Sequence, residues 1–171
     1  MIETRRLVLR RMVEDDAHFI LELLSDPSWL AFIGDRGVRT LDDARRYIAT
    51  GPAALYARFG FGLYLTALRQ AGEPIGVCGL LRRDDLDEVE LGFAFLARHH
   101  GRGYAREAAA ATLDYADTRL GVTRIVAIAA PGNERSIRLL QTLGMEFERM
   151  VQLPGDATAK KLFGCNLAPA P

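Results

Sequence analysis

The 171-residue sequence contains little cysteine and histidine and no excess of charge of either sign. It has two cysteines, three histidines and 22 basic against 22 acidic residues, which gives a formal net charge of zero. Cys78 and Cys165 lie in the apolar runs IGVCGLL and KLFGCNLA, where a small buried hydrophobic side chain is the simplest interpretation. A disulfide or a cysteine-based metal site is therefore disfavoured. The balanced charge also gives no indication of a nucleic-acid or membrane partner.

Long apolar runs are absent as well. The N-terminal MIETRRLVLRR has basic residues but no hydrophobic stretch of signal-peptide length, and no segment approaches the roughly 20 apolar residues of a membrane span. These absences predict a cytoplasmic protein. Because no repeat, low-complexity segment or linker divides the chain, we expect a single domain over residues 1–171, present as a monomer or homodimer.

The sequence does contain a clear succession of strand and helix patterns. Apolar periodicity predicts a strand at 7–10, a helix ended by Asp26-Pro27, an irregular segment around 29–37 and a second short helix after Thr40. Further strands are expected from Phe61, Pro74, Glu88 and Arg124 and at 145–153 and 160–167, with helices over 105–116 and 137–143, the last ended by Gly144. The predicted fold class is α+β: a mixed, mostly antiparallel sheet of about seven strands, about four helices and one central parallel strand-helix-strand crossover.

The segment RHHGRGYA, residues 98–105, lies between a predicted strand and a predicted helix and allows three interpretations. A metal site would require His99 and His100 to converge, but adjacent side chains diverge in extended structure and His18 is remote in sequence. A plain turn would explain the glycines by backbone conformation alone. An anion-binding loop would explain the glycines, the free amides of a helix N-terminus and the neighbouring arginines together.

The anion-binding interpretation accounts for arginine at the start of a helix, where positive charge opposes the helix dipole. The dipole penalty is about 0.3–1 kcal/mol, whereas each charge-assisted hydrogen bond to an anion contributes about 1.5–3 kcal/mol. A dinucleotide-binding loop fits less well, because Arg106 stands where a third glycine is expected. The groups expected at the anion are the amides of Gly103, Tyr104 and Ala105, with close approach at Gly101 and positive charge from Arg98 and Arg102.

Four motifs extend this interpretation to almost the whole chain. They are TRRLVLRRM near the start, ELGFAFL, GRGYAREA, and NERSIRLLQTLGM, in which Met145 replaces an aromatic residue. In order and spacing they resemble the GNAT superfamily of acetyl-CoA-dependent N-acetyltransferases, and within it the branch of the ribosomal-protein alanine N-acetyltransferases. The family's acyl-CoA signature, Gln or Arg-x-x-Gly-x-Gly or Ala, matches residues 100–105, with His100 in the first place. The resemblance extends from about Ile2 to Leu167.

The resemblance implies where acetyl-CoA, the expected cosubstrate, would bind; no metal is expected. The strands that begin at Glu88 and Arg124 should splay apart, with pantetheine between them and the pyrophosphate on the amides of the signature loop. The residues that this implies are Phe93, Phe95, His100, Gly101, Arg102, Gly103, Tyr104, Ala105, Asn133 and Ser136.

The candidate catalytic residues follow from the chemistry of acetyl transfer, which needs a neutral amine, a stabilised oxyanion and a protonated thiolate. Glu88 and Glu90 share one face of a strand, and Glu90, which directly precedes Leu-Gly-Phe, is the candidate base. A solvent-facing glutamate is the alternative. Many family members use a tyrosine as the acid, but Leu140 occupies that position, so the branch resemblance implies Ser136. Asn133 and Ser136 would otherwise be a helix N-cap and a first-turn polar residue.

The acceptor is less constrained by the sequence. Branch resemblance favours a protein or peptide N-terminal amine. A small amine, such as an amino sugar, polyamine or amino acid, and a non-catalytic acyl-CoA-binding module are the alternatives. The acceptor site is expected to be lined by Trp29, Phe32, Arg36 and the loop 152–158, with core packing as the simpler role for Phe32.

Overall fold

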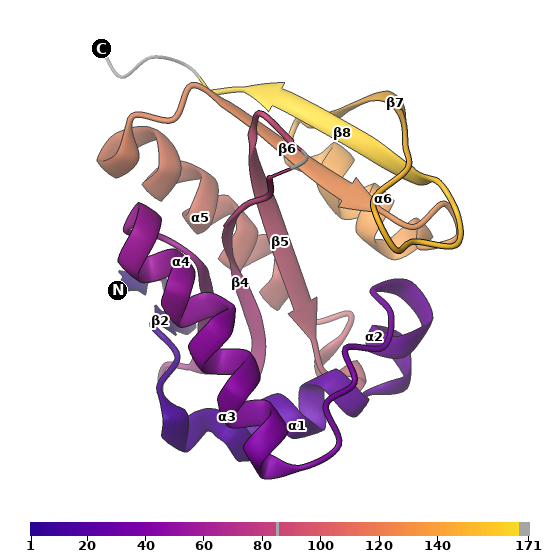
Figure 1. The fold of residues 1–171 in the computed structure, drawn as a ribbon. Coiled ribbons are helices and arrows are strands. Elements are labelled where there is room, and N and C mark those ends of the chain that lie inside the picture. The colour runs from indigo at the N-terminus through magenta and orange to yellow at the C-terminus, as the bar shows by residue number, and fades with distance from the viewer. Residues whose placement is uncertain (85, 168–171) are drawn as a thin grey trace.

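The computed structural model describes residues 1–84 and 86–167, which form a mixed eight-stranded sheet with helices on both faces (Figure 1). The strands are β1 (Ile2–Glu3), β2 (Leu7–Arg10), β3 (Leu63–Leu68), β4 (Pro74–Arg82), β5 (Val89–Phe95), β6 (Arg124–Ala129), β7 (Glu146–Val151) and β8 (Lys160–Asn166). The helices are α1 (Ala17–Ser25), α2 (Pro27–Phe32), α3 (Leu41–Thr50), α4 (Pro52–Phe59), α5 (Tyr104–Leu120) and α6 (Glu134–Thr142), with 3₁₀ turns η1 (Glu14–Asp16) and η2 (Ala97–His99). The strand order is β1-β2-β3-β4-β5-β6-β8-β7.

Two hydrophobic layers hold the helices against the sheet. On one face, Leu65 of β3 and Val77 of β4 pack among the buried residues of α1 and α3. On the other face, Leu80 of β4 and Leu91 of β5 pack with the buried alanines of α5, such as Ala108. The small alanine side chains allow α5 to lie close to the strands that it crosses. The alternation along β4 and β5 thus assigns each residue of these strands to one of the two faces.

The parallel pairing of β5 with β6 is confined to the start of the two strands. Val89 pairs with Ile125 and Glu90 with Val126, and beyond this point the strands diverge (Figure 1). Every other neighbouring pair in the sheet is antiparallel. The strand-helix-strand crossover β5-α5-β6 therefore surrounds a V-shaped gap at the centre of the sheet.

These features confirm the predicted α+β class, the mostly antiparallel sheet and the single parallel crossover. The structure adds elements that the sequence pattern did not indicate. β1 is only two residues long, α2 overlaps the start of the segment expected to be irregular, and α4 begins at Pro52, where a proline in the first turn needs no amide partner. Gly144, with φ +78°, follows the end of α6 as predicted. The single domain expected over 1–171 includes residues 85 and 168–171, which lie outside the described residues.

None of the helices formed by the described residues is both long enough and apolar enough to cross a membrane.

Candidate active site

The loop before α5 presents a row of backbone amides without partners. Gly101 and Gly103 have φ values of +76° and +77°, in the left-handed region that glycine enters without strain. The first amide to bond back into α5 is that of Glu107, which donates to the Gly103 carbonyl at 3.1 Å. Within residues 1–84 and 86–167, no acceptor pairs with the amides of residues 101–106. This end of α5 suits an anion, because the free N–H groups and the helix dipole act together.

Residues between β1 and β2 hold this loop and the start of α5 in position. Arg6 donates to the Glu107 carboxylate at 2.6 Å and to the Arg102 carbonyl at 3.0 Å. Its guanidinium also lies 4.6 Å from the centroid of the Tyr104 ring. Thr4 donates to the second oxygen of Glu107 at 2.6 Å. Burial raises the pKa of Glu107, but the hydrogen bonds from Thr4 and Arg6 outweigh burial, so that its pKa is lowered and the carboxylate remains charged.

The two histidines of the loop have different surroundings. His100 Nε2 lies 2.7 Å from the Phe95 carbonyl oxygen, and Nδ1 accepts a hydrogen bond from the guanidinium of Arg135. Since a guanidinium can only donate, this network assigns the ring proton to Nε2, which donates to Phe95. His99 is buried, and its Nε2 lies 3.3 Å from the carboxylate of Glu73 without forming a hydrogen bond to it. No cluster of three metal-ligating side chains occurs within the described residues.

The free amides open onto a cavity of about 960 Å³, and the unpaired edge of β5 borders the same cavity. Leu96 N donates to the Ile75 carbonyl across from β4 at 3.0 Å. Because backbone groups alternate along a strand, those of Phe93 and Phe95 face the opposite way, into the gap. The Phe95 carbonyl already accepts from His100, so Phe93 retains both of its groups and Phe95 its N–H.

Glu90 lies in the cavity wall and is only 4 % exposed. Both of its carboxylate oxygens bond to Arg83, through Nε and, at 3.3 Å, through Nη2. Glu88 instead lies 3.5 Å from the guanidinium of Arg124 and does not line the cavity. The alternative of a solvent-facing Glu90 is therefore wrong, and of the two glutamates only Glu90 faces the cavity.

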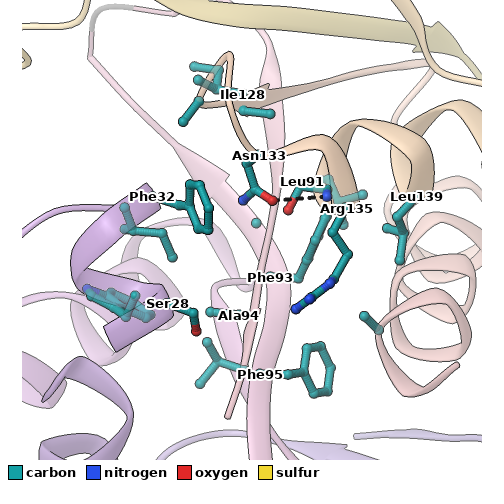
Figure 2. Close-up of a pocket in the computed structure, with 18 of the residues that line it drawn as sticks. Ser28, Phe32, Leu91, Phe93, Ala94, Phe95, Ile128, Asn133, Arg135 and Leu139 are labelled. Carbon is teal, nitrogen blue, oxygen red and sulfur yellow. Dashed lines mark hydrogen bonds between the residues drawn. The ribbon is translucent and has the colours of Figure 1, made fainter. Parts of the chain in front are cut away.

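Asn133 and Ser136 lie at the start of α6, on the other side of the gap. Asn133 caps the helix, because its Oδ1 accepts from Ser136 N at 3.2 Å, the bond drawn as a dashed line in Figure 2. Both residues also line the cavity, so the residues that cap α6 are available to a ligand as well. The Ser136 hydroxyl has no hydrogen-bond partner among the described residues, whereas Leu140 is buried in the core.

The arginines of segment 98–105 do not line the cavity. Arg98 pairs with Glu22 of α1 at 2.5 Å, and the side chain of Arg102 is exposed. Neither side chain therefore faces the cavity, and their supply of positive charge to an anion stays a prediction, although the Arg102 amide is one of the free donors. Arg106 and Arg135 line the cavity instead. Figure 2 shows Arg135 reaching from α6 toward β5.

The other end of the cavity is bordered by α2, the loop that follows it, and the β7–β8 loop. Trp29 and Arg36 lie there as predicted, and residues of the 152–158 loop, Leu153 among them, line it too. Phe32 is 36 % exposed and belongs to no buried cluster, so the expected core role is wrong. It projects from α2 into the cavity, near Asn133 (Figure 2).

Sequence reasoning missed Arg83 and Arg135. Arg135 lies inside the NERS motif, between Asn133 and Ser136, and this position could have indicated that its side chain lines the cavity. Arg83 stands in a charged link after β4, where nothing in the sequence indicates that its partner is Glu90 rather than a nearby aspartate. Pairing across two strands depends on the register of the sheet, which only the structure gives.

Comparisons with known proteins agree with this geometry. An acetyltransferase (GNAT) domain model matches residues 6–146, so the chain belongs to the GNAT family and is an N-acetyltransferase. The N-acetyltransferase p20 of Bacillus licheniformis is 29% identical over 151 residues, which are 87% of this chain and 84% of that protein. The structure of an acetyltransferase from Agrobacterium tumefaciens str. C58 has a TM-score of 0.82 and 26% identity, covering 96% of this chain and 92% of that one.

Two more distant structures share the fold but differ in acceptor. A ribosomal-protein alanine acetyltransferase from Vibrio fischeri is 17% identical, with a TM-score of 0.76 and coverage of 96% and 94% of the two chains. A spermidine N-acetyltransferase from Vibrio cholerae, in complex with CoA and spermine, is 19% identical, with a TM-score of 0.77 and coverage of 95% and 96%. At such identities the likeness establishes the fold alone. The assignment to the ribosomal-protein branch accordingly stays a prediction.

Proposed function

We propose that the cavity binds acetyl-CoA and that the protein transfers the acetyl group to a primary amine, with the α-amine of a protein or peptide as the favoured acceptor. The observation that carries this proposal is the row of free amides at 101–106, which opens onto the same cavity as the unpaired edge of β5. The CoA in the spermidine acetyltransferase supports the donor, and the ribosomal-protein acetyltransferase supports the acceptor.

The residues at the N-terminal end of α5 fit a pyrophosphate, which needs several donors and positive charge. A Cβ built at Gly101 would meet no atom within 4 Å, so the space beside this backbone is open to a ligand. Arg106 and Arg135 add positive charge in the cavity wall, and His100 fixes the position of Arg135. We assign the pyrophosphate to the backbone of Gly101, Arg102, Gly103, Tyr104 and Ala105.

The edge of β5 fits the amide-containing pantetheine arm. Phe93 offers both backbone groups and Phe95 its N–H, so that the arm would extend the sheet as an additional strand. Asn133 and Ser136 face this edge from α6.

The reacting centre lies where Glu90 and Ser136 border the cavity. When bound, acetyl-CoA supplies the thioester that donates the acetyl group. Glu90 accepts the proton of the amine, directly or through water, and Ser136 donates a proton to the departing thiolate. Arg83 orients the carboxylate of Glu90 and also competes with the amine for its oxygens. General acid–base catalysis increases the rate by about 10²–10⁴-fold. Positioning of the two reactants can supply effective molarities of about 10⁵ M or more, so positioning is the larger contribution to the rate.

A small-molecule amine is the second candidate acceptor, supported by the spermine in the spermidine acetyltransferase structure. Release of free thiol from acetyl-CoA, measured with N-terminal peptides, amino sugars, polyamines and amino acids, tests the function and ranks the acceptors. We expect release with peptide α-amines to exceed release with the other amines. Binding of acetyl-CoA without release to any acceptor would contradict the proposal.

Two matched glycine variants test the pyrophosphate seat. Gly101 and Gly121 flank opposite ends of α5, both have positive φ, and an added Cβ would meet no atom within 4 Å at either position. Alanine costs about 1–2 kcal/mol of backbone strain at such a conformation, but only Gly101 lines the cavity. We expect calorimetry to show about a tenfold or greater loss of acetyl-CoA affinity in Gly101→Ala and no loss in Gly121→Ala. Equal acetyl-CoA affinities in the two variants would contradict binding of the pyrophosphate at this loop.

A further inference from the structure

The charged side chains that line the cavity are mostly basic. The acidic ones are each paired with a neighbouring cation: Glu90 with Arg83, Glu134 with Arg138 at 3.4 Å and Asp156 with Lys160 at 3.9 Å. The other basic lining residues are Arg36, Arg82, Arg106 and Arg135. A cationic ligand would therefore find no uncommitted carboxylate among the described residues of the wall.

Arg36 is the uncommitted cation at the acceptor end. Its guanidinium forms no hydrogen bond or ion pair with any residue in the described part of the chain. The neighbouring carboxylate of Asp35 is held by Arg39 and accepts from Gly37 N at 2.8 Å. Arg36 and Tyr47 both line the cavity, and the charge of Arg36 opposes the increase that burial causes in the pKa of Tyr47.

The loop that carries Arg36 is held in position from both sides. Trp29, only 5 % exposed, donates from its indole to the Gly34 carbonyl at 3.1 Å. On the other side, Thr40 and Asp43 form the capping box at the start of α3. Arg36 therefore lies on a loop that is held by hydrogen bonds at both ends and that lines the cavity.

These charges distinguish between classes of amine. A polyamine keeps further ammonium groups after one nitrogen has entered the site, and these would face Arg36 without a free carboxylate to receive them. An amine that also carries a carboxylate would gain a charge-assisted, bidentate contact with Arg36.

We propose that the acceptor is an anionic amine and that Arg36 selects it by binding its carboxylate. This inference rests on the proposed acetyltransferase function. The chemistry is shared by a peptide with acidic residues after its N-terminal amine and by a free amino acid. Both therefore serve as probes.

The test compares kcat/KM, from initial rates of thiol release, for four acceptors: the peptide amides Ala-Glu-Glu and Ala-Lys-Lys, free glutamate, and spermidine. We expect the better of the two anionic acceptors to exceed both cationic ones by about tenfold or more in the wild-type enzyme. Comparing Ala-Glu-Glu with glutamate distinguishes the peptide from the free amino acid.

The variants Arg36→Glu and Arg36→Lys test whether Arg36 is the source of the preference for anionic acceptors. We expect Arg36→Glu to raise KM for anionic acceptors about tenfold, with kcat little changed, and to lower KM for Ala-Lys-Lys, while Arg36→Lys retains part of the preference. Arg119→Glu is the matched control, because Arg119 is exposed in the last turn of α5, pairs with no residue in the described part of the chain and does not line the cavity. It should leave the ranking unchanged.

Three results would overturn the inference. Spermidine or Ala-Lys-Lys as the best acceptor, or an equal loss on every acceptor in Arg36→Glu, would refute anionic selection while leaving acetyl transfer intact. Failure of every acceptor to release thiol would refute the proposed function itself, and this inference with it.

Discussion

At the scale of single residues, His100 shows how a departure from the family signature can preserve a function. A glutamine amide offers a donor and an acceptor, and a neutral imidazole offers one of each as well. In this protein the donor bonds the Phe95 carbonyl and the acceptor receives Arg135. Histidine can therefore connect β5 to α6 where the signature has glutamine, whereas arginine has no acceptor for this purpose.

Glu90 allows a prediction at the residue scale, because the pH dependence of the rate distinguishes a role as the base from a role in positioning. If Glu90 accepts the amine's proton, Glu90→Gln should lower kcat/KM by about 10²-fold at neutral pH, and the deficit should shrink as pH rises toward the pKa of the amine, because the amine then deprotonates unaided. A deficit of equal size at every pH would instead assign Glu90 to positioning through its ion pair with Arg83. The measurement is a pH profile of initial rates.

The control for this experiment is Glu88→Gln. Glu88 carries the same charge two residues earlier in the chain, but its carboxylate lies beside Arg124, outside the cavity. We expect its pH profile to match the wild type. Thermal melting of both variants will separate loss of catalysis from loss of folded protein.

At the scale of elements, the link between the β1–β2 connection and α5 joins residues about a hundred positions apart in the sequence. Thr4 and Arg6 bond the two oxygens of Glu107 in the first turn of α5, where a negative charge is also favoured by the helix dipole. The link fixes the start of α5 and so the loop that carries the free amides. The N-terminal motif therefore contributes to the candidate acetyl-CoA site without lining it.

Glu107→Gln is expected to lower the stability at neutral pH by about 1.5–3 kcal/mol, because hydrogen bonds to a charged group are lost. The folded-state pKa of Glu107 lies below its ordinary value, so its stabilisation is complete above the unfolded pKa of about 4.3 and is lost as pH falls through the folded-state pKa. The difference in melting temperature between wild type and variant should therefore narrow below about pH 4. Glu22→Gln, which breaks the half-exposed pair with Arg98, should cost less than about 1 kcal/mol. A pH-independent difference for Glu107→Gln would contradict this account.

The elements also show which features a sequence can and cannot predict. Strongly periodic segments such as β4 and α5, and the glycines of the loop before α5, followed from local pattern and backbone conformation. The role of Phe32 and the partner of Arg98 did not, because each depends on where α1 and α2 lie against the sheet. The pairing of Arg83 with Glu90 depends on strand register for the same reason. Local rules therefore predicted the donor loop better than the acceptor end of the cavity.

At the scale of the whole molecule, the sheet consists of two parts that meet at a short seam. Strands β1–β5 form one part and β6–β8 the other, and the parallel pairing between them is limited to Val89 with Ile125 and Glu90 with Val126. α5 connects the two parts in sequence and packs against both β4 and β5 (Figure 1). A ligand in the gap would contact both parts, and its binding free energy would be added to their association.

This arrangement predicts a specific pattern of amide hydrogen exchange. In the free protein the amides of residues 101–106 should exchange rapidly, because none has a partner in the described structure, and Phe93 N–H should exchange faster than Ala94 N–H, which faces β4. Saturating acetyl-CoA should slow exchange at 101–106 and at Phe93 while leaving the first turn of α3, capped by Thr40, unchanged. At one hundred times the dissociation constant the complex should also gain about 2.7 kcal/mol against unfolding. Unchanged exchange at residues 101–106 or at Phe93 would show that the ligand does not bind against both the loop before α5 and the free edge of β5.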